Sequence, residues 1–262
     1  MPIPRVVTRV VARARPRVPD RAWPLLDTLA SFVGTGPVVG LPRVGRVLAL
    51  AAHPDDESAG CAGTLALLAA SGADVHVVFA TRGEATWGAT APPEEVGRRR
   101  AAEAAESCRL LGTRAPAFLG LPDGGLPGRE AEIGGLLAEH VRAARPEVVL
   151  VPWFLDGHPD HRALSDALEH AGLDPATEVW GYETWTALPP TRLVDVTRVM
   201  HLKEASMAVH ATALQTFDVT AALGLSRWRS MSGLHGRGHA EAFLALPAPD
   251  YVALSHRAGA GR

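Results

Sequence analysis

Residues 47–57 read VLALAAHPDDE, six apolar residues followed directly by a histidine, a proline and three carboxylates. A short, uninterrupted apolar run is typical of a strand that is buried on both faces of a parallel sheet. The following residues fit this interpretation, because residues 64–70 have a helical pattern and residues 75–80 form a second apolar run. We therefore predict a strand–helix–strand unit whose first strand ends at the HPDDE sequence.

The same alternation continues along the chain. The pattern predicts helices over residues 94–111, 130–144, 161–171 and 197–213, and short strands over residues 117–119 and 147–151. Strands that alternate with helices at this spacing favour a parallel sheet covered on both faces. The predicted fold class is therefore α/β, a Rossmann-like three-layer sandwich with a mostly parallel sheet, and the pattern after residue 180 is less regular.

Two loops rich in histidine and aspartate follow strands of this predicted sheet. The loop after residues 47–52 carries His53, Asp55 and Asp56, and residues 156–161, after the 147–151 strand, read DGHPDH. Because the carboxyl ends of parallel strands form the ligand crevice, both loops lie at one edge. Adjacent buried carboxylates repel each other unless a cation is bound. Two histidines and one carboxylate with an open position are the ligands expected of a catalytic zinc.

Each loop taken alone has a simpler interpretation, since a His-Pro-Asp triplet is more often a turn with a capping aspartate. The two loops together favour the metal site. The chain has no G-x-G-x-x-G after its first strand, no P-loop, no H-E-x-x-H and no G-x-S-x-G, so the corresponding chemistries are unsupported. A net charge of −2 argues against a nucleic-acid partner.

Three motifs resemble the LmbE/PIG-L family of zinc-dependent N-acetylglucosaminyl deacetylases. They are AHPDDE at 52–57, LPDGGL at 121–126 and HPDH at 158–161, and the resemblance covers roughly residues 46–246. It implies zinc on His53, Asp56 and His161. It also implies that Asp55 is the base that takes a proton from the zinc-bound water, and that His158 stabilises the oxyanion, for which an imidazolium is suited.

The resemblance assigns further roles around this centre. Asp160 would orient a histidine, Arg100 would bind substrate, and Asp123 falls where relatives contact sugar hydroxyls. His210 occupies a position at which relatives often carry histidine or tyrosine, and it is a further candidate for substrate binding. Arg82 follows the 75–80 strand and either lines the crevice or forms a helix cap or a surface ion pair.

The expected function is hydrolysis of the N-acetyl group of an N-acetylglucosamine-type glycoside, with zinc as cofactor. Ferrous iron also suits a His/His/carboxylate set. One alternative is a zinc amidase acting on a larger N-acyl or thiol-conjugate substrate, and another is a carbohydrate-binding relative without turnover. The expected partner is a small amino-sugar substrate. The sequence specifies neither the aglycone nor the oligomeric state.

The predicted domain organisation has two parts, a basic arm and lead-in over residues 1–45 and a single deacetylase-like domain over residues 46–262. Within the arm, residues 4–21 set six arginines among valines and three prolines. This pattern suits a solvated arm, or more weakly a surface lying on anionic lipid. No apolar run approaches the roughly 20 residues that cross a bilayer. Two cysteines fit a reducing compartment, and we expect a cytoplasmic protein.

Overall fold

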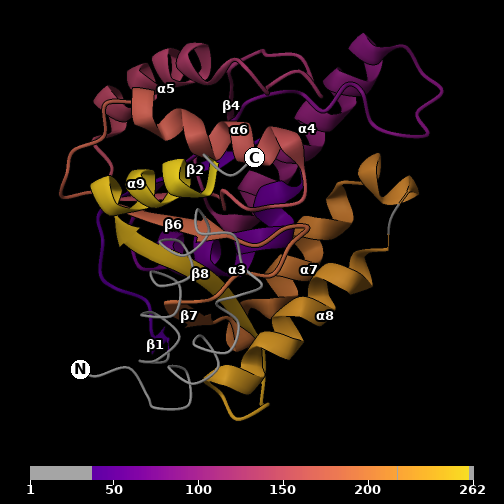
Figure 1. The fold of residues 1–262 in the computed structure, drawn as a ribbon. Helices are drawn as coiled ribbons and strands as arrows, with labels where there is room; N and C mark the ends of the chain where they lie inside the picture. Colours follow the sequence, from indigo (N-terminus) through magenta and orange to yellow (C-terminus); the bar gives the residue numbers. More distant parts are fainter. Residues whose placement is uncertain (1–36, 217, 260–262) are drawn as a thin grey trace, which may run out of the picture.

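The apolar run after Arg46 forms a strand in the middle of an eight-stranded sheet (Figure 1). The computed structural model describes residues 37–216 and 218–259, and the strand order is β1-β7-β8-β6-β5-β2-β3-β4. All neighbouring strands are parallel except those that flank β8, which runs antiparallel to β6 and β7. The predicted α/β class with a mostly parallel sheet is confirmed. The strands are β1 (Val38–Val39), β2 (Arg46–Ala51), β3 (Asp74–Phe79), β4 (Ala117–Phe118), β5 (Val148–Pro152), β6 (Glu178–Tyr182), β7 (Arg192–Asp195) and β8 (Ala240–Pro247).

Helices connect these strands and cover both faces of the sheet. They are α3 (Asp56–Ala70), α4 (Pro93–Leu111), α5 (Glu130–Ala144), α6 (Pro159–Asp166), α7 (Met200–Val209), α8 (Val219–Arg229) and α9 (Ala248–Gly259). Short 3-10 helices are η3 (Ala167–His170), η4 (Thr197–Val199), η5 (Ala213–Gln215) and η6 (Ser230–Ser232). Figure 1 shows α5, α6 and α9 on one side of the sheet and α7 and α8 on the other.

The two faces of the sheet support two separate hydrophobic cores. Side chains of a strand alternate between faces, and β2 shows this clearly. Leu48 and Leu50 pack with α5, α6 and α9, whereas Val47 and Ala49 pack with α3, α4 and α7. Burial on both faces explains why the strand is apolar along its length.

Helix α3 begins at Asp56, eight residues before the predicted start at residue 64. Glycine disfavours a helix interior, and α3 contains Gly60 and Gly63. Both positions lack a side chain because the neighbours approach closely: a Cβ atom on Gly60 would lie 2.2 Å from Tyr182, and one on Gly63 would lie 2.6 Å from Val196. Tertiary packing therefore outweighs helix propensity here, and it places the start of α3 at the edge of the sheet.

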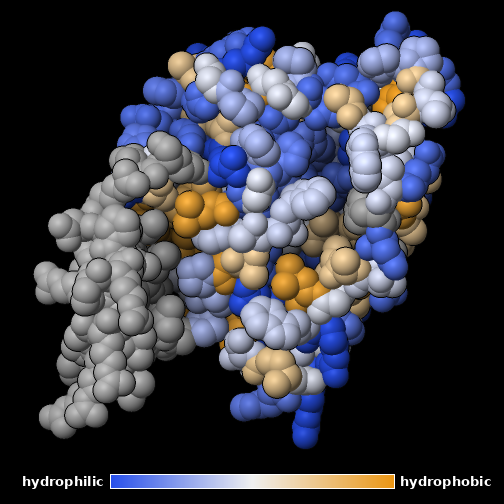
Figure 2. All heavy atoms as spheres, turned by 45° about the vertical axis from the view of Figure 1, so that its right-hand side comes forward, coloured by the Kyte–Doolittle hydropathy of each residue, from blue (hydrophilic) through white to orange (hydrophobic). Residues whose placement is uncertain are grey.

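The predicted N-terminal arm lies mostly outside the described residues, so its interpretation stays a prediction. Residues 37–45 are described, and Val38 and Val39 pair with Arg192 and Leu193 of β7. No helix in the described part of the chain has the length and apolar character needed to cross a bilayer. On the face drawn in Figure 2, apolar residues form separate small patches among hydrophilic ones.

Candidate metal and catalytic site

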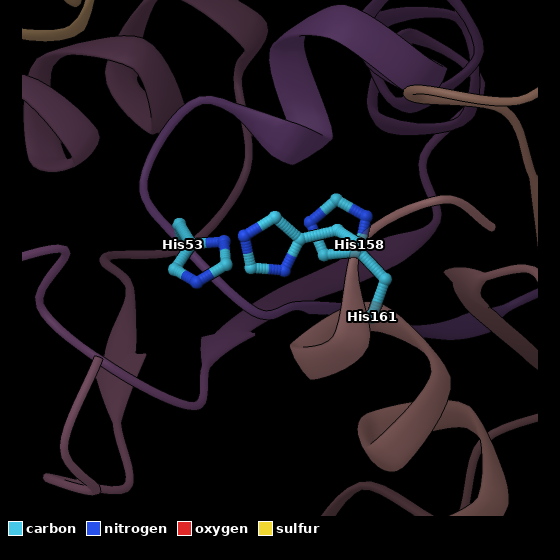
Figure 3. A group of neighbouring side chains, drawn as sticks. All are labelled: His53, His158 and His161. Atoms are coloured by element: carbon cyan, nitrogen blue, oxygen red, sulfur yellow. The ribbon is translucent and has the colours of Figure 1, made fainter. Parts of the chain in front are cut away.

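Three histidines meet at the carboxyl ends of β2 and β5, which are neighbours in the sheet. His53 follows β2 with one residue between them, and His158 and His161 stand at the start of α6, after β5. Their ring centroids lie 4.8 Å apart for His53 and His158, 4.7 Å for His158 and His161, and 5.4 Å for His53 and His161 (Figure 3). The fold therefore brings both sequence motifs into one cluster.

His161 is fully buried, and its two ring nitrogens have different surroundings. Nδ1 lies 2.9 Å from Oδ1 of Asp156 and 2.9 Å from the hydroxyl of Thr184. Nε2 has no hydrogen-bond partner among the described residues, although it lies 3.1 Å from Oδ1 of Asp56. Because Nδ1 donates its proton to Asp156, the neutral ring presents the lone pair of Nε2 toward Asp56.

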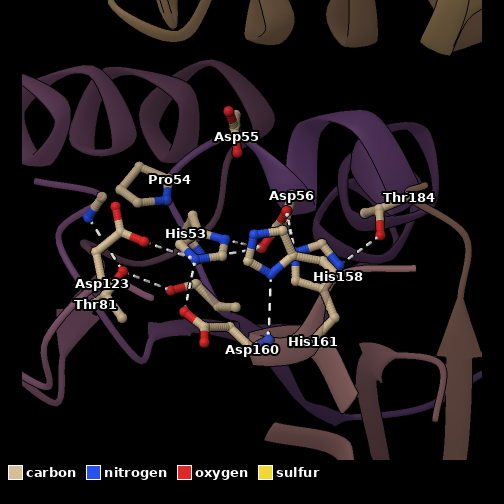
Figure 4. A network of polar contacts seen from close by, with 12 residues as sticks. His53, Pro54, Asp55, Asp56, Thr81, Asp123, His158, Asp160, His161 and Thr184 are labelled. Carbon is tan, nitrogen blue, oxygen red and sulfur yellow. Dashed lines mark hydrogen bonds and ion pairs between the residues drawn. The ribbon is translucent and has the colours of Figure 1, made fainter. Parts of the chain in front are cut away.

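His53 has the same kind of contacts as His161, but the roles of Nδ1 and Nε2 are exchanged. Nε2 lies 3.1 Å from both Oδ2 of Asp160 and Oδ1 of Asp123, so these carboxylates accept its proton. Nδ1 is then left facing Asp56, 3.5 Å from Oδ2, and that oxygen also accepts the backbone N–H of His53. Figure 4 shows these contacts around the imidazoles.

The two histidines and Asp56 fit a divalent metal ion. Each imidazole has one nitrogen held by a carboxylate and the other directed toward Asp56, the arrangement that fixes the tautomer of a metal-binding histidine. Burial lowers the pKa of His161, but the carboxylates of Asp56 and Asp156 outweigh it and raise that pKa to about 9. The carboxylates thus strongly favour positive charge at this point, which a cation would also provide.

His158 forms a group with His53 and His161, in which one ligand atom of each residue lies within 4.8 Å of the others. A second group with the same spacing combines His53 with Asp123 and Asp160. His158 Nδ1 accepts the backbone N–H of Asp160, so the neutral ring carries its proton on Nε2. Burial lowers the pKa of His158, as do the charges of His53 and His161. These effects favour a neutral ring over the imidazolium expected from the sequence.

Asp55 and Asp56 point in different directions, as Figure 4 shows. Asp55 precedes α3 with φ 128°, a backbone conformation that side chains rarely adopt and that costs about 1–3 kcal/mol. Its carboxylate lies 3.0 Å from the guanidinium of Arg100. Burial raises the pKa of Asp55 to about 6 against the opposing attraction of Arg100. A strained turn thus directs one carboxylate to the histidines and the other to an arginine.

Arg100 is buried, and its two terminal nitrogens are engaged by the protein. Nη1 donates to the carbonyl of Gly83 at 3.0 Å and to the hydroxyl of Thr86 at 2.6 Å, and Nη2 donates to the carbonyl of Pro54 and to Asp55. Through these hydrogen bonds Arg100 joins the loop after β3 to the start of α3. This differs from the direct substrate contact implied by the resemblance.

Asp123 lies on the side of the site next to His53, and Arg82 belongs to the loop that follows β3. Asp123 Oδ2 accepts the backbone N–H of Ala85, and the backbone N–H of Asp123 donates to Glu84. Arg82 is exposed over the ring of Phe118 and, with Glu84, lines a cleft of 320 Å³. Arg82 thus lines a cleft beside α4, and Asp123 contacts His53.

His210 does not face this crevice. It is fully buried, and Nε2 lies 3.2 Å from Oε1 of Glu57 and 3.1 Å from the hydroxyl of Ser58. Burial lowers the pKa of His210, but the charge and hydrogen bond of Glu57 raise it more, so the net shift is upward. These contacts describe a buried ion pair beneath the site, in contrast to the substrate contact expected from the sequence.

Asp156 has a role that the sequence analysis did not assign. Its two oxygens accept hydrogen bonds from the backbone of His158 and from His161, and from three groups of residues 184–186. The position of Asp156 in the DGHPDH loop was a signal for such a role. No pattern indicated that residues 184–186, after the unpredicted strand β6, would meet this loop.

The chain is similar in sequence to several known proteins. The family model described as PIG-L, GlcNAc-PI de-N-acetylase, matches residues 48–172. A 1D-myo-inositol 2-acetamido-2-deoxy-alpha-D-glucopyranoside deacetylase of Kineococcus radiotolerans is 33% identical over 56% of this chain, and the chain spans about half of that relative (51%). The diacetylchitobiose deacetylase of Thermococcus kodakarensis is 30% identical over 64% of this chain and 69% of its own length.

A solved structure gives the same result for the fold. The N,N'-diacetylchitobiose deacetylase of Pyrococcus horikoshii superposes with a TM-score of 0.65 at 26% sequence identity. The match covers 79% of this chain and 86% of that one. The likeness therefore extends beyond the residues that the family model matches.

Proposed function

The chain belongs to the PIG-L family, and from this premise we propose that it is a deacetylase that removes the N-acetyl group of an N-acetylglucosamine-type substrate. The observation that carries the proposal is the convergence of His161 Nε2 and His53 Nδ1 on Asp56, beside the carboxylate of Asp55. The relatives named above act on acetylated amino sugars, which supports this substrate class. A small amino-sugar partner and a cytoplasmic location are part of the proposal.

His53, Asp56 and His161 would hold the metal ion, and we propose zinc. Zinc bound there would supply Lewis-acid chemistry, polarising the acetyl carbonyl and lowering the pKa of a water molecule to about 7. The protein's own contribution is to keep the correct nitrogen of each histidine available. Asp160 and Asp156 do this by accepting the proton of the other nitrogen.

Asp55 is the proposed base. A carboxylate whose pKa lies near 6 can take a proton from the attacking water and return it at neutral pH. The water oxygen bonds to the acetyl carbon, the carbon–nitrogen bond breaks, and the amine leaves with the proton that Asp55 received. Arg100 orients Asp55 through the contact at 3.0 Å. The products are acetate and the free amino sugar.

His158 is proposed to stabilise the negative charge on the former carbonyl oxygen. Since the backbone N–H of Asp160 binds Nδ1, the proton on Nε2 is free to be donated into the site. One donor of this kind is worth a factor of about 10²–10³ in kcat. Asp123, at the His53 side, is the proposed contact for sugar hydroxyls.

Acetate release from a panel of N-acetylglucosamine glycosides, measured with the zinc-loaded full chain, tests the proposal. The Asp55→Asn variant should keep one equivalent of zinc and lose at least about 10²-fold in kcat. The His161→Ala variant should lose zinc as well. Release of acetate from no member of the panel, or an Asp55→Asn rate within a fewfold of the wild type, would contradict the assignment.

A further inference from the structure

Trp185 is 74% exposed, although the backbone on both sides of it is firmly held. Its own backbone N–H donates to Asp156 at 3.0 Å, and so does that of Thr186 at 3.2 Å. The carbonyl of Thr186 accepts the indole N–H of Trp153 at 3.0 Å. The chain therefore fixes the Cα position of Trp185 while leaving its ring in solvent.

A buried ion pair between Glu183 and Arg229 also holds this loop in place. Glu183 accepts the backbone N–H of Leu188 at 2.7 Å and a hydrogen bond from Arg229 Nε at 2.9 Å. Arg229 Nη2 also donates to the carbonyl of Leu188 at 2.6 Å. Residues 183–188 thus have both ends joined through one arginine. The backbone that carries the ring is thus ordered in advance, which reduces the entropy cost of binding a ligand.

The ring of Trp185 lies beside the proposed catalytic centre. Its centroid is 6.2 Å from that of His158, and the tilt between the two rings is 43°. In Figure 4 the neighbouring residue Thr184 and the sugar-side residue Asp123 lie on opposite sides of the imidazoles. The ring of Trp185 meets His158, whereas Asp123 meets His53.

The two sides of the site differ in chemistry. The His53 side carries Asp123, which contacts His53, and Glu84, which accepts the backbone N–H of Asp123, and such carboxylates suit the hydroxyls of a sugar. The His158 side presents an exposed indole, whose faces suit hydrocarbon. An amide is planar, and its nitrogen and acyl chain leave the carbonyl carbon in different directions. If the sugar on the nitrogen lies toward Asp123, the acyl chain extends toward Trp185.

We infer that Trp185 contacts the acyl group of the substrate and determines which acyl lengths are cleaved, so that the site takes N-acyl groups longer than acetyl. The inference rests on the proposed function and deepens it. Each methylene half buried against the ring should improve kcat/KM about twofold. Four additional methylenes, as in hexanoyl compared with acetyl, then give about a 16-fold effect in total.

The test uses glucosamine carrying acetyl, butanoyl or hexanoyl groups, with release of the free amine as the readout for the zinc-loaded full chain. The expected result is that Trp185→Ala lowers the hexanoyl-to-acetyl ratio of kcat/KM about 16-fold relative to the wild type. Trp185→Phe should keep most of the ratio. Trp87→Ala is the matched control, because Trp87 is 84% exposed and belongs to the loop on the Asp123 side, so that variant should keep the wild-type ratio.

A binding measurement separates the inference from the deacetylase proposal. Calorimetry compares hexanoate with acetate, the carboxylate products, on the zinc-loaded wild type and on Trp185→Ala. Tighter binding of hexanoate that is lost in Trp185→Ala supports the inference without turnover. Equal effects of Trp185→Ala on all three substrates, or an unchanged ratio, would overturn it while acetate release still upheld the proposed function. A wild type that cleaves none of the series and binds both carboxylates equally contradicts both.

Discussion

The Nδ1 atom of His161 lies 2.9 Å from Oδ1 of Asp156, and both side chains are completely buried. The second oxygen of Asp156 accepts hydrogen bonds from the hydroxyl of Thr184 and from the backbone of Trp185 and Thr186. One carboxylate therefore connects the proposed metal ligand to the loop that follows β6. The position of the loop and the tautomer of the histidine depend on the same group.

Replacing Asp156 with asparagine should weaken metal binding. If the asparagine oxygen keeps the bonds to residues 184–186, its NH₂ group faces Nδ1 of His161 and the proton moves to Nε2. The nitrogen proposed as a ligand is then blocked. Loss of such a partner typically lowers metal affinity about 10–100-fold. Zinc titration of the wild type and of Asp156→Asn, with competition by a chelator, measures the change.

The control for this prediction is Thr184→Val, which removes one hydroxyl from Asp156 and His161 but leaves the carboxylate in place. Its zinc affinity should fall less than that of Asp156→Asn. Equal affinity in the wild type and Asp156→Asn would show that Asp156 does not set the tautomer of His161.

The sequence predicted the part of the fold in which local pattern and burial agree. The predicted strand at residues 47–52 and the predicted helix at 94–111 correspond to β2 and α4. Strand β8 was not predicted, because Glu241 lies within it and interrupts the apolar pattern. In the structure Glu241 is buried against Lys203 of α7 at 2.7 Å. That contact is distant in sequence, and no local pattern indicates it.

The candidate site, like the fold, could be predicted from the sequence only in part. Because parallel strands end at one edge of a sheet, the motifs at His53 and His161 could be placed together before the structure was known. The proposed role of Arg100 could not be judged in this way, since it depends on which groups the guanidinium meets. The structure pairs it with Asp55 and with the carbonyl groups of Gly83 and Pro54. Burial of His210 against Glu57 was likewise not visible in the sequence.

The His210–Glu57 pair should make stability depend on pH. The pKa of His210 is raised in the folded protein, so its contribution is complete below about pH 6.5 and is lost as the pH rises through the raised value. The pKa of Glu57 is held low by His210 and by hydroxyl donors, although burial acts to raise it. Its contribution is complete above about pH 4.5 and is lost as the pH falls through the lowered value.

The pair should therefore contribute most between these two limits. The His210→Gln variant keeps an N–H donor for Glu57 but no charge, and it should lose about 1–3 kcal/mol of unfolding free energy near pH 5.5. The loss should shrink at pH 9. Denaturant unfolding of both proteins at the two pH values, at one zinc concentration, gives the difference. A loss that grows with pH would contradict the assigned charge state of His210.

Replacing Arg229 with alanine should destabilise the loop over residues 183–188. Glu183 would then be left buried without its charged partner, which typically costs about 3–5 kcal/mol. The Glu183→Gln/Arg229→Met double variant removes both charges and keeps an acceptor for the backbone N–H of Leu188, so it should recover part of that loss. Urea unfolding of the three proteins measures these values. If Arg229→Ala lost less than about 1 kcal/mol, the pair would behave as a solvent-exposed one and would not anchor the loop.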